Sequence, residues 1–297
     1  MKMLLFAIGL PYFQVCLNAM SKWKCPFCSS SLSLNNKAWA CNNGHSYDVA
    51  KEGYVNLLLA QHKNSKQPGD NKQMVNGRRA FLEQGFYQPL ANAITDIFNR
   101  HISTLTSQSE VRFFDAGCGE GYYMGQVRQG CQHADCQIEF SGLDISKFAI
   151  QKAAKKYPQQ HFAVASSFQL PMQDNSQDTV LQIFAPSSEL EVHRVLKTKG
   201  IWITVNPAAN HLYEFKQALY DKPVEHKTLN LVPDGFELTQ QLNISFTFDL
   251  VDMQQTENLL MMTPYYWSAT QEKKQNLVTN LQQFTADFDI NILAKKA

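Results

Sequence analysis

The feature that most constrains the fold is a glycine-rich turn between an apolar segment and a helical one. Residues 111–117 read VRFFDAG, typical of a buried strand, and Gly119 and Gly121 follow directly. Glycines at such a junction let the backbone turn sharply and approach a ligand closely. Further apolar segments at 138–144, 161–167, 178–186 and 201–207 alternate with segments of helical length at 146–157 and 188–200. This alternation predicts an α/β fold with a parallel, doubly wound sheet.

Three other segments complete the predicted architecture. Residues 236–250, FELTQQLNISFTFDL, are predicted to supply antiparallel strands at the edge of the sheet. Between 78 and 105 apolar residues recur at helical spacing, with interruptions near Gly85 and Pro89. The polar, basic stretch 61–77 contains the turn Pro68-Gly69 and is predicted to be a connector or an exposed loop.

Two details of the glycine-rich turn favour S-adenosylmethionine as its ligand. The turn has the form D-x-G-x-G-x-G, in which Asp115 ends the strand and is expected near the ammonium of a methionine moiety. Asp144 ends the next segment, 23 residues past Gly121, where a carboxylate accepts hydrogen bonds from both ribose hydroxyls. Ser166 and Ser167 close the third segment, where the adenine is expected. On this pattern alone a dinucleotide remains the alternative, and Asp144 also fits an ordinary residue at a helix N-terminus.

A cysteine–histidine quartet near the N-terminus predicts a zinc site. Its spacing is Cys25-x2-Cys28-x12-Cys41-x3-His45. Four soft or borderline ligands suit a closed tetrahedral zinc site, which leaves no open position for a catalytic water. The predicted role is therefore structural. The alternative is three buried cysteines beside a coincidental histidine.

The distribution of charge and the number of cysteines indicate the partner and the cellular compartment of the chain. Nine Lys and Arg oppose three Asp and Glu between residues 22 and 79, whereas the whole chain carries a net charge of only +1. This basic N-terminal segment favours a module that faces nucleic acid, and the alternative is a small domain with solvated lysines. The seven cysteines are an odd number, and three have metal-ligand spacing, which predicts a reducing compartment and a cytoplasmic protein.

The first 19 residues are expected to be an upstream extension of the reading frame, with Met20 as the true start. Their apolar run, residues 3–10, is broken by Pro11 and is too short to span a bilayer. Leu17 fits poorly at a signal-peptide cleavage site. The sequence predicts no other membrane segment.

The end of the fourth apolar segment is the expected place for a methyl acceptor. Phe184-Ala185-Pro186 lies there, at the carboxyl edge of the predicted sheet. Phe184 is predicted either to stack on an extruded base or to belong to the core.

Taken together, these motifs resemble the bacterial 23S rRNA guanine-N1 methyltransferases. The resemblance runs from Met20 nearly to the C-terminus, and it includes stretches that a generic methyltransferase lacks. Besides the quartet, DAGCGEGYY, GLDIS, VASS and IFAP, these are DVAKEGYVNLL (48–58), QPGD (67–70), RRAFLEQGFYQPL (78–90), HLYEFK (211–216) and LLMMTPYYW (259–267). One departure is that the Tyr-Ala-Pro-Cys run of the relatives is Phe184-Ala185-Pro186-Ser187 here.

The resemblance implies a class I Rossmann-like methyltransferase domain over residues 106–297. It is preceded by a zinc-binding module over 20–58 and by a basic connector and helical segment over 59–105. The resemblance also implies a 23S rRNA hairpin loop as substrate and a homodimer. It assigns the quartet to zinc, and it assigns Tyr87, Gly119, Glu120 and His211 to the cofactor. From the residues alone, Tyr87 fits a core aromatic and His211 a surface histidine.

Methylation at guanine N1 needs a base, because N1 carries a proton at neutral pH. The sequence does not identify that base, and the nearest acidic candidates are Glu120 and Asp174. The target guanine must be unpaired, as in a loop whose bases are splayed out. Together with the zinc module, four basic residues are predicted to hold RNA phosphates, namely Lys63, Lys66, Arg78 and Arg79.

Two other functions fit parts of the same pattern. One is a methyltransferase of a small molecule, a protein or another RNA, whose zinc module binds a partner. The other is a non-catalytic zinc-ribbon RNA-binding protein, which the intact glycines of residues 115–121 and Asp144 disfavour.

Overall fold

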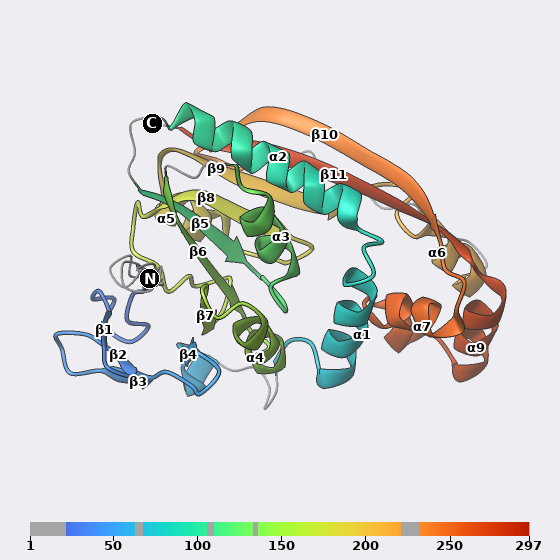
Figure 1. Cartoon of the computed structure of the whole chain (residues 1–297), viewed down its shortest axis with the longest axis horizontal. Helices are drawn as coiled ribbons and strands as arrows, with labels where there is room; N and C mark the ends of the chain where they lie inside the picture. The colour runs from blue at the N-terminus through green and yellow to red at the C-terminus, as the bar shows by residue number, and fades with distance from the viewer. Residues whose placement is uncertain (1–21, 63–67, 106–109, 133–135, 221–231, 297) are drawn as a thin grey trace, which may run out of the picture.

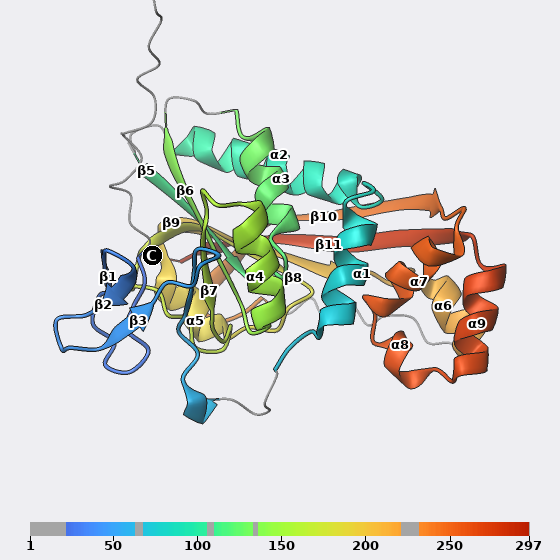
Figure 2. The same cartoon turned by 60° about the horizontal axis from the view of Figure 1, so that its bottom comes forward.

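The computed structural model describes residues 22–62, 68–105, 110–132, 136–220 and 232–296 (Figure 1). Residues 1–19 and the two basic residues Lys63 and Lys66 therefore lie outside the described part. The described strands form an eight-stranded sheet in the order β10-β11-β9-β8-β5-β6-β7-β4 and a three-stranded sheet in the order β1-β2-β3. The small sheet lies at one end of the main sheet, and a group of helices, α7–α9, lies at the other (Figure 2).

Five parallel strands form the centre of the main sheet. They are β5 (Glu110–Ala116), β6 (Gln137–Asp144), β7 (His161–Val164), β8 (Gln177–Ile183) and β9 (Leu196–Pro207). The chain runs outward from β5 through β6 and β7, and then returns to place β8 on the opposite side of β5. This arrangement confirms the predicted doubly wound sheet and puts the reversal of strand order between β5 and β8.

The apolar segments are continuous because both faces of the sheet are covered. On β5, Phe113 packs into the core cluster of one face and Phe114 into that of the other, and both are fully buried. The first face is covered by α2 (Gln88–Thr104), α3 (Tyr122–Gly130) and α4 (Lys147–Lys156). The second face is covered by α5 (Glu189–Val195) and by residues of the N-terminal module. Strands buried on both faces need uninterrupted apolar residues rather than alternation.

The antiparallel edge predicted for residues 236–250 is present but has two long strands. β10 (Phe236–Asp249) pairs with β11 (Gln283–Lys295), and β11 pairs antiparallel with β9. The sequence analysis did not anticipate β11. Between these strands lie α7 (Met253–Met261), α8 (Tyr265–Ser268) and α9 (Gln271–Asn280), while α6 (Tyr213–Leu219) follows β9.

Two predicted helix boundaries were wrong. The helix expected over 188–200 ends at Val195, because the chain is already extended at Leu196, where β9 begins. Leu196 is fully buried against the second face of the sheet. The connector expected over 61–77 becomes α1 (Lys72–Leu82) at its C-terminal end, and Asn71 caps it by accepting hydrogen bonds from the N–H groups of Gln73 and Met74. Asparagine is a preferred residue at such a cap.

The N-terminal module is attached to the main sheet. It comprises β1 (Ser33–Asn35), β2 (Ala38–Ala40), β3 (Ser46–Asp48) and β4 (Tyr54–Asn56), and the short helix η1 (Ala60–His62) follows. β4 is the outermost strand of the main sheet and pairs in parallel with β7. Trp23 is buried, and its ring meets that of Phe114 edge-on at 6.4 Å. The module and the main sheet therefore share a core.

The helices α1 and α7 cross closely at Gly77. A Cβ atom there would lie 3.3 Å from both the carbonyl oxygen of Asn258 and the Cβ of Met261. This crossing packs α7, one of the helices inserted between β10 and β11, against α1, which precedes β5 in the chain. Within the described part of the chain, no helix has both the length and the apolar character needed to cross a bilayer.

Candidate active site and metal centre

Two adjoining cavities lie at the carboxyl ends of the parallel strands. The first has a volume of about 290 Å³ and is lined by the glycine-rich turn, the end of β6 and the segment after β7. The second has a volume of about 950 Å³ and is lined by the ends of β8 and β9 together with α1, α7 and α8. The cavities share wall residues, among them Asp70, Arg78 and Phe184. Ligands of open α/β sheets bind at this position, beyond the strand ends where the strand order reverses.

The glycine-rich turn is fitted closely to its surroundings. Gly117 has a φ of 105°, and a Cβ atom there would lie 2.5 Å from the Cβ of Ala185. The N–H of Gly119 donates a hydrogen bond of 3.0 Å to Oδ2 of Asp144, and the N–H of Ser146 donates one of 2.7 Å to Oδ1. The Asp144 carboxylate is thereby fixed in the wall of the first cavity. Its remaining lone pairs fit it to accept hydrogen bonds from two hydroxyls.

Two further carboxyl groups line the first cavity and are buried. Asp115 and Glu120 are 2% and 1% exposed. Burial, with a contribution from the charge of Asp144, raises the pKa of Asp115 to about 8. Burial likewise raises the pKa of Glu120 to about 7. Within the described residues, neither carboxylate oxygen of Glu120 has a hydrogen-bond partner, and Arg79 approaches it only to 3.9 Å. A buried carboxylate that accepts no hydrogen bond is costly, so this cavity fits a ligand that brings a cationic donor, such as the ammonium group of S-adenosylmethionine.

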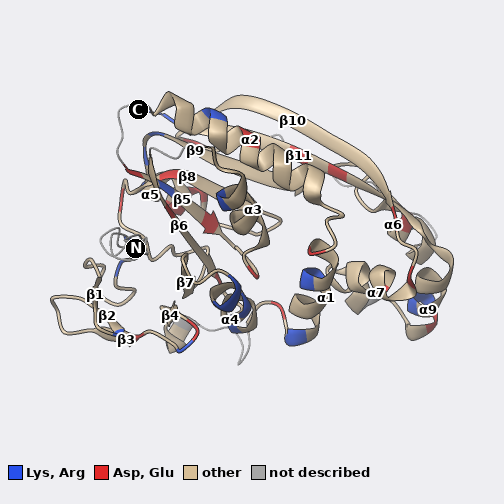
Figure 3. Cartoon of the chain, in the orientation of Figure 1, with Lys and Arg blue, Asp and Glu red and all other residues tan. Residues whose placement is uncertain are grey.

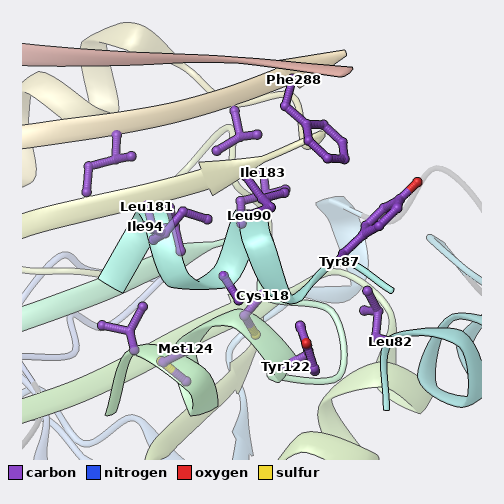
Figure 4. Packing of buried hydrophobic residues seen from close by; sticks show 14 of the residues in the cluster. Leu82, Tyr87, Leu90, Ile94, Cys118, Tyr122, Met124, Leu181, Ile183 and Phe288 are labelled. Atoms are coloured by element: carbon purple, nitrogen blue, oxygen red, sulfur yellow. The ribbon is translucent and has the colours of Figure 1, made fainter. Parts of the chain in front are cut away.

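The residues predicted to bind the cofactor divide between the two cavities. Asp115, Gly117, Gly119, Glu120 and Asp144 line the first, with Ser166 and Ser167. Tyr87 and His211 line the second. Tyr87 is 1% exposed at the start of α2, and Figure 4 shows its side chain near that of Phe288. Its ring lies 5.1 Å from that of Phe288 and 6.2 Å from that of His211. The roles of these residues toward the cofactor remain predictions.

Phe184 stands in the shared wall of the two cavities. Its backbone has a φ of 51°, which is unusual for a residue other than glycine, and its side chain is 45% exposed. Its ring lies 5.8 Å from that of His211 and 5.6 Å from that of Phe288. Gln182 holds the following turn. Its Nε2 donates to the carbonyl of Ala185, and its Oε1 accepts from Ser187 Oγ at 2.6 Å and Trp202 Nε1 at 3.1 Å.

Asp70 and Arg78 form an ion pair in the same shared wall. The sequence analysis did not identify Asp70 as a site residue, although its QPGD segment was one of the family-specific stretches. It had named Asp174 as a candidate base. Asp174 is 56% exposed, pairs with Lys24 and Arg194, and lines neither cavity. Its position is therefore wrong for that role.

The cysteine–histidine quartet is gathered at one point. The ligand atoms of Cys25, Cys28, Cys41 and His45 all lie within 4.8 Å of one another. The two sulfur atoms of Cys28 and Cys41 are 3.7 Å apart, and Cys41 Sγ is 3.4 Å from His45 Nδ1. Sulfur ligands around a tetrahedral zinc ion are about 3.8 Å apart, given a Zn–S bond of about 2.3 Å. Hydrogen bonding to Ser30 lowers the pKa of Cys28 to about 5, which favours the thiolate that zinc requires.

Two neighbouring helices, α4 and α1, carry several basic residues each and pack against each other. Figure 3 shows these residues, together with others on α2, α3 and α9. On α4 they are Lys147, Lys152, Lys155 and Lys156. On α1, Arg79 pairs with Glu83 at 2.8 Å, while Arg78 faces the cavities. The predicted contacts of Arg78 and Arg79 with RNA remain predictions.

Comparison with known proteins identifies families along most of the chain. Residues 23–66 match the family described as RlmA, N-terminal, a zinc ribbon, and residues 107–283 match the family described as methyltransferase domain. The protein YxjB of Bacillus subtilis strain 168, provisionally named a 23S rRNA (guanine-N(1)-)-methyltransferase, is 32% identical over 281 residues, which cover 92% of this chain and 96% of that protein. The 23S rRNA (guanine(748)-N(1))-methyltransferase of Streptomyces fradiae is 32% identical over 203 residues, which cover 68% of this chain and 69% of that protein. Among solved structures, the cyclase SpnF is 18% identical with a TM-score of 0.44, over 69% of this chain and 80% of that one.

Proposed function

Because this chain belongs to the family of 23S rRNA guanine-N1 methyltransferases with an RlmA-type zinc ribbon, we propose that it methylates N1 of a guanine in a hairpin loop of 23S rRNA. The methyl group comes from S-adenosylmethionine, and zinc is the structural metal of the N-terminal module. The observation that carries the proposal is the pair of adjoining cavities with a shared wall. One suits the methyl donor and the other has room for a nucleobase.

The first cavity is assigned to the methyl donor. The fixed carboxylate of Asp144 accepts the ribose hydroxyls, and the segment at Ser166 and Ser167 borders the adenine. Glu120, whose buried carboxylate accepts no hydrogen bond from any described residue, faces the ammonium of the methionine moiety. Tyr87 and His211 then border the methionine end of the donor from the second cavity. S-adenosylmethionine supplies an electrophilic methyl group, so the residues around it mainly align the reactants and exclude water.

The second cavity is assigned to the target guanine. Phe184 and His211 line this cavity with their rings 5.8 Å apart, and the exposed ring of Phe184 offers a face on which an extruded base can stack. Methylation at N1 requires that the base be unpaired, since N1 lies on the Watson–Crick edge. Loop nucleotides splayed out and stacked on aromatic side chains meet that requirement.

The surface around the cavities is assigned to RNA phosphates. Lys147 begins α4 directly after the turn that contributes Asp144 and Ile145 to the wall of the first cavity, and Lys156 acts electrostatically on Glu120 in the same wall. Contacts with phosphates make affinity fall as salt rises, because each contact releases counterions. Arg78 and Arg79 were predicted to contribute, and their side chains are equally exposed, at 26%. Arg78 faces the cavities, whereas Arg79 pairs with Glu83.

Two broader properties complete the proposal. A cytoplasmic location agrees with an rRNA substrate and with the six described cysteines, none of which forms a disulfide. A homodimer is implied by the family. The outer edge of β10 has no neighbouring strand in the described part of the chain and is open to pairing. Light scattering after size-exclusion chromatography tests the dimer.

The proposed function is tested by offering competing substrates. The purified protein is incubated with methyl-labelled S-adenosylmethionine and either total rRNA lacking the modification or total protein from the same cells. Label recovered as N1-methylguanosine supports the proposal, whereas label confined to protein favours a protein methyltransferase. A protein whose unfolding temperature does not respond to S-adenosylmethionine fits the non-catalytic alternative.

A further inference from the structure

We infer that Asp70 is the base that accepts the N1 proton of the target guanine, with Arg78 beside it stabilising the charge that develops on O6. This inference rests on the proposed function. It deepens that function by naming a catalytic residue at a position that the sequence analysis left open.

Asp70 lies between the proposed sites of donor and acceptor. Among the described residues, it is the only carboxylate that lines the second cavity, and it lines the first cavity as well. Arg78 also lines both. The methyl group must pass from one cavity to the other, so the pair stands beside the path of the reaction.

The loop that carries Asp70 is held firmly at the end of β6. Ser146 Oγ donates a hydrogen bond of 2.7 Å to the backbone carbonyl of Asp70. Gly69 has a φ of 77°, and a Cβ atom there would lie 2.7 Å from Cγ2 of Ile145. Only glycine fits such a close approach in this conformation. The Asp70 backbone is thereby tied to the same strand end that presents Asp144.

The side chain of Asp70 can accept a further hydrogen bond. Nη1 of Arg78 donates to Oδ2 of Asp70, and the two side chains are 26% and 25% exposed. The other oxygen, Oδ1, has no hydrogen-bond partner within the described part of the chain. It is therefore available to an N–H group that enters the second cavity.

The charges of the pair complement the Watson–Crick edge of guanine. That edge presents N1–H and the N2 amino group as donors and O6 as an acceptor. A carboxylate accepts from the donors, and a guanidinium donates to O6. When the N1 proton leaves, negative charge spreads to O6, where Arg78 stabilises it in a water-poor site.

The step balances without any further reactant. The N1–H bond breaks, and its proton passes to a carboxylate oxygen of Asp70. The electron pair left on N1 forms the bond to the methyl carbon, while the methyl–sulfur bond breaks and its pair stays on sulfur. The positive charge of the donor and the negative charge of Asp70 disappear together, and the protonated carboxyl later releases its proton to water.

The other carboxylates are worse placed. Asp115, Glu120 and Asp144 line the first cavity only. Asp144 interacts electrostatically with both Asp70 and Arg78. The charged groups around Asp70 therefore include the carboxylate of Asp144 and the guanidinium of Arg78. Its own two oxygens are already held by backbone N–H groups.

The test compares Asp70→Asn with a matched control, Asp174→Asn, which changes a surface acid that lines neither cavity. Single-turnover methylation of 23S rRNA transcribed in vitro is measured at saturating S-adenosylmethionine over a range of pH. We expect Asp70→Asn to lose roughly 100- to 10,000-fold in rate, the usual contribution of a general base. Its affinity for S-adenosylhomocysteine should not change. Its rate should climb with pH where the wild-type rate is flat, because hydroxide then removes the proton. Asp174→Asn should react like the wild type.

Three outcomes would overturn the inference. One is an Asp70→Asn variant that reacts at the wild-type rate. Another is a loss of rate that follows a loss of S-adenosylhomocysteine binding with an unchanged pH profile, which indicates a structural role. A third is that Asp70→Glu, which retains a carboxylate, is no more active than Asp70→Asn. In each case the wild-type protein still methylates guanine N1, so the proposed function stands. If the wild-type protein forms no N1-methylguanosine, that result contradicts both the proposed function and the inference about Asp70.

Discussion

The N–H of Gly119 lies 3.0 Å from Oδ2 of Asp144 and donates a hydrogen bond to it. This bond joins the glycine-rich turn after β5 to the end of β6. Because Ser146 holds the other carboxylate oxygen, the Asp144 side chain is oriented before any ligand arrives. The turn and the proposed ribose site are therefore one structural unit, and a substitution in either should alter the geometry of the other.

Replacing Asp144 by alanine should weaken binding of S-adenosylmethionine. The two ribose hydroxyls would lose their acceptor and the N–H of Gly119 its partner, at a cost of about 1–3 kcal/mol. Isothermal titration calorimetry measures the change, with the surface variant Asp174→Ala as the control. An unchanged affinity would mean that the ribose binds elsewhere.

Replacing Glu120 by glutamine should change how stability depends on pH. Burial raises the pKa of Glu120 from 4.5 to about 7 in the folded protein. A carboxyl whose pKa is raised by folding stabilises the protein fully below its unfolded pKa, and this contribution is lost as the pH rises through the folded pKa. The unfolding temperature of the ligand-free wild type should therefore fall relative to Glu120→Gln as the pH rises from 4.5 to about 7. Parallel curves for the two proteins would show that the burial of Glu120 does not act on stability in this way.

Replacing Cys41 by alanine should remove zinc and also destabilise the catalytic sheet. The two parts share a core, because Trp23 packs on Phe114 and β4 extends the main sheet. Cofactor binding below the unfolding temperature should persist, since no residue of the quartet lines the first cavity. Elemental analysis and thermal unfolding measure both effects. Cys131→Ala is the control, because Cys131 lies outside the quartet. A Cys41→Ala protein that keeps one zinc ion per chain, or that unfolds at the wild-type temperature, would contradict this account.

Replacing Phe184 by alanine should impair methylation of rRNA. Stacking of a base on an aromatic ring contributes about 1–3 kcal/mol. We expect kcat/KM for rRNA to fall accordingly while the affinity for S-adenosylmethionine is retained. Phe168 lines the first cavity but not the second, so Phe168→Ala should act on the cofactor instead. Equal effects of both variants on rRNA would argue against a stacking role for Phe184.

The sequence predicted the parts of the fold whose signals are local. Each of the strands β5 to β9 contains an apolar run, and the turn contains a glycine pattern. Both signals can be recognised within a few residues. Leu196 shows where this fails, because a buried leucine fits equally well at the end of an apolar helix face and at the start of a strand. The three-residue strand β4 is too short to carry a periodic signal, and its pairing with β7 depends on tertiary contacts.

The candidate site was predictable to the same extent. Asp115, Gly117, Gly119 and Asp144 were identified because each stands at a strand end within one recognisable pattern. The packing of α1 beside the strand ends brings together Asp70, Arg78 and Phe184. No local sequence pattern predicts that these three residues are neighbours. For the same reason, Asp174 was a candidate base by chemical type, and only its position in a surface ion-pair cluster excludes it.

The central claim is that this chain methylates guanine N1 in 23S rRNA. It is tested most directly by mass-spectrometric mapping of 23S rRNA from cells that lack the gene and from the same cells with the gene restored. The account predicts one loop guanine that is unmodified in the first sample and carries N1-methylguanosine in the second, with no restoration by a Gly119→Val protein unable to bind the cofactor. Identical maps of N1-methylguanosine with and without the gene would contradict it.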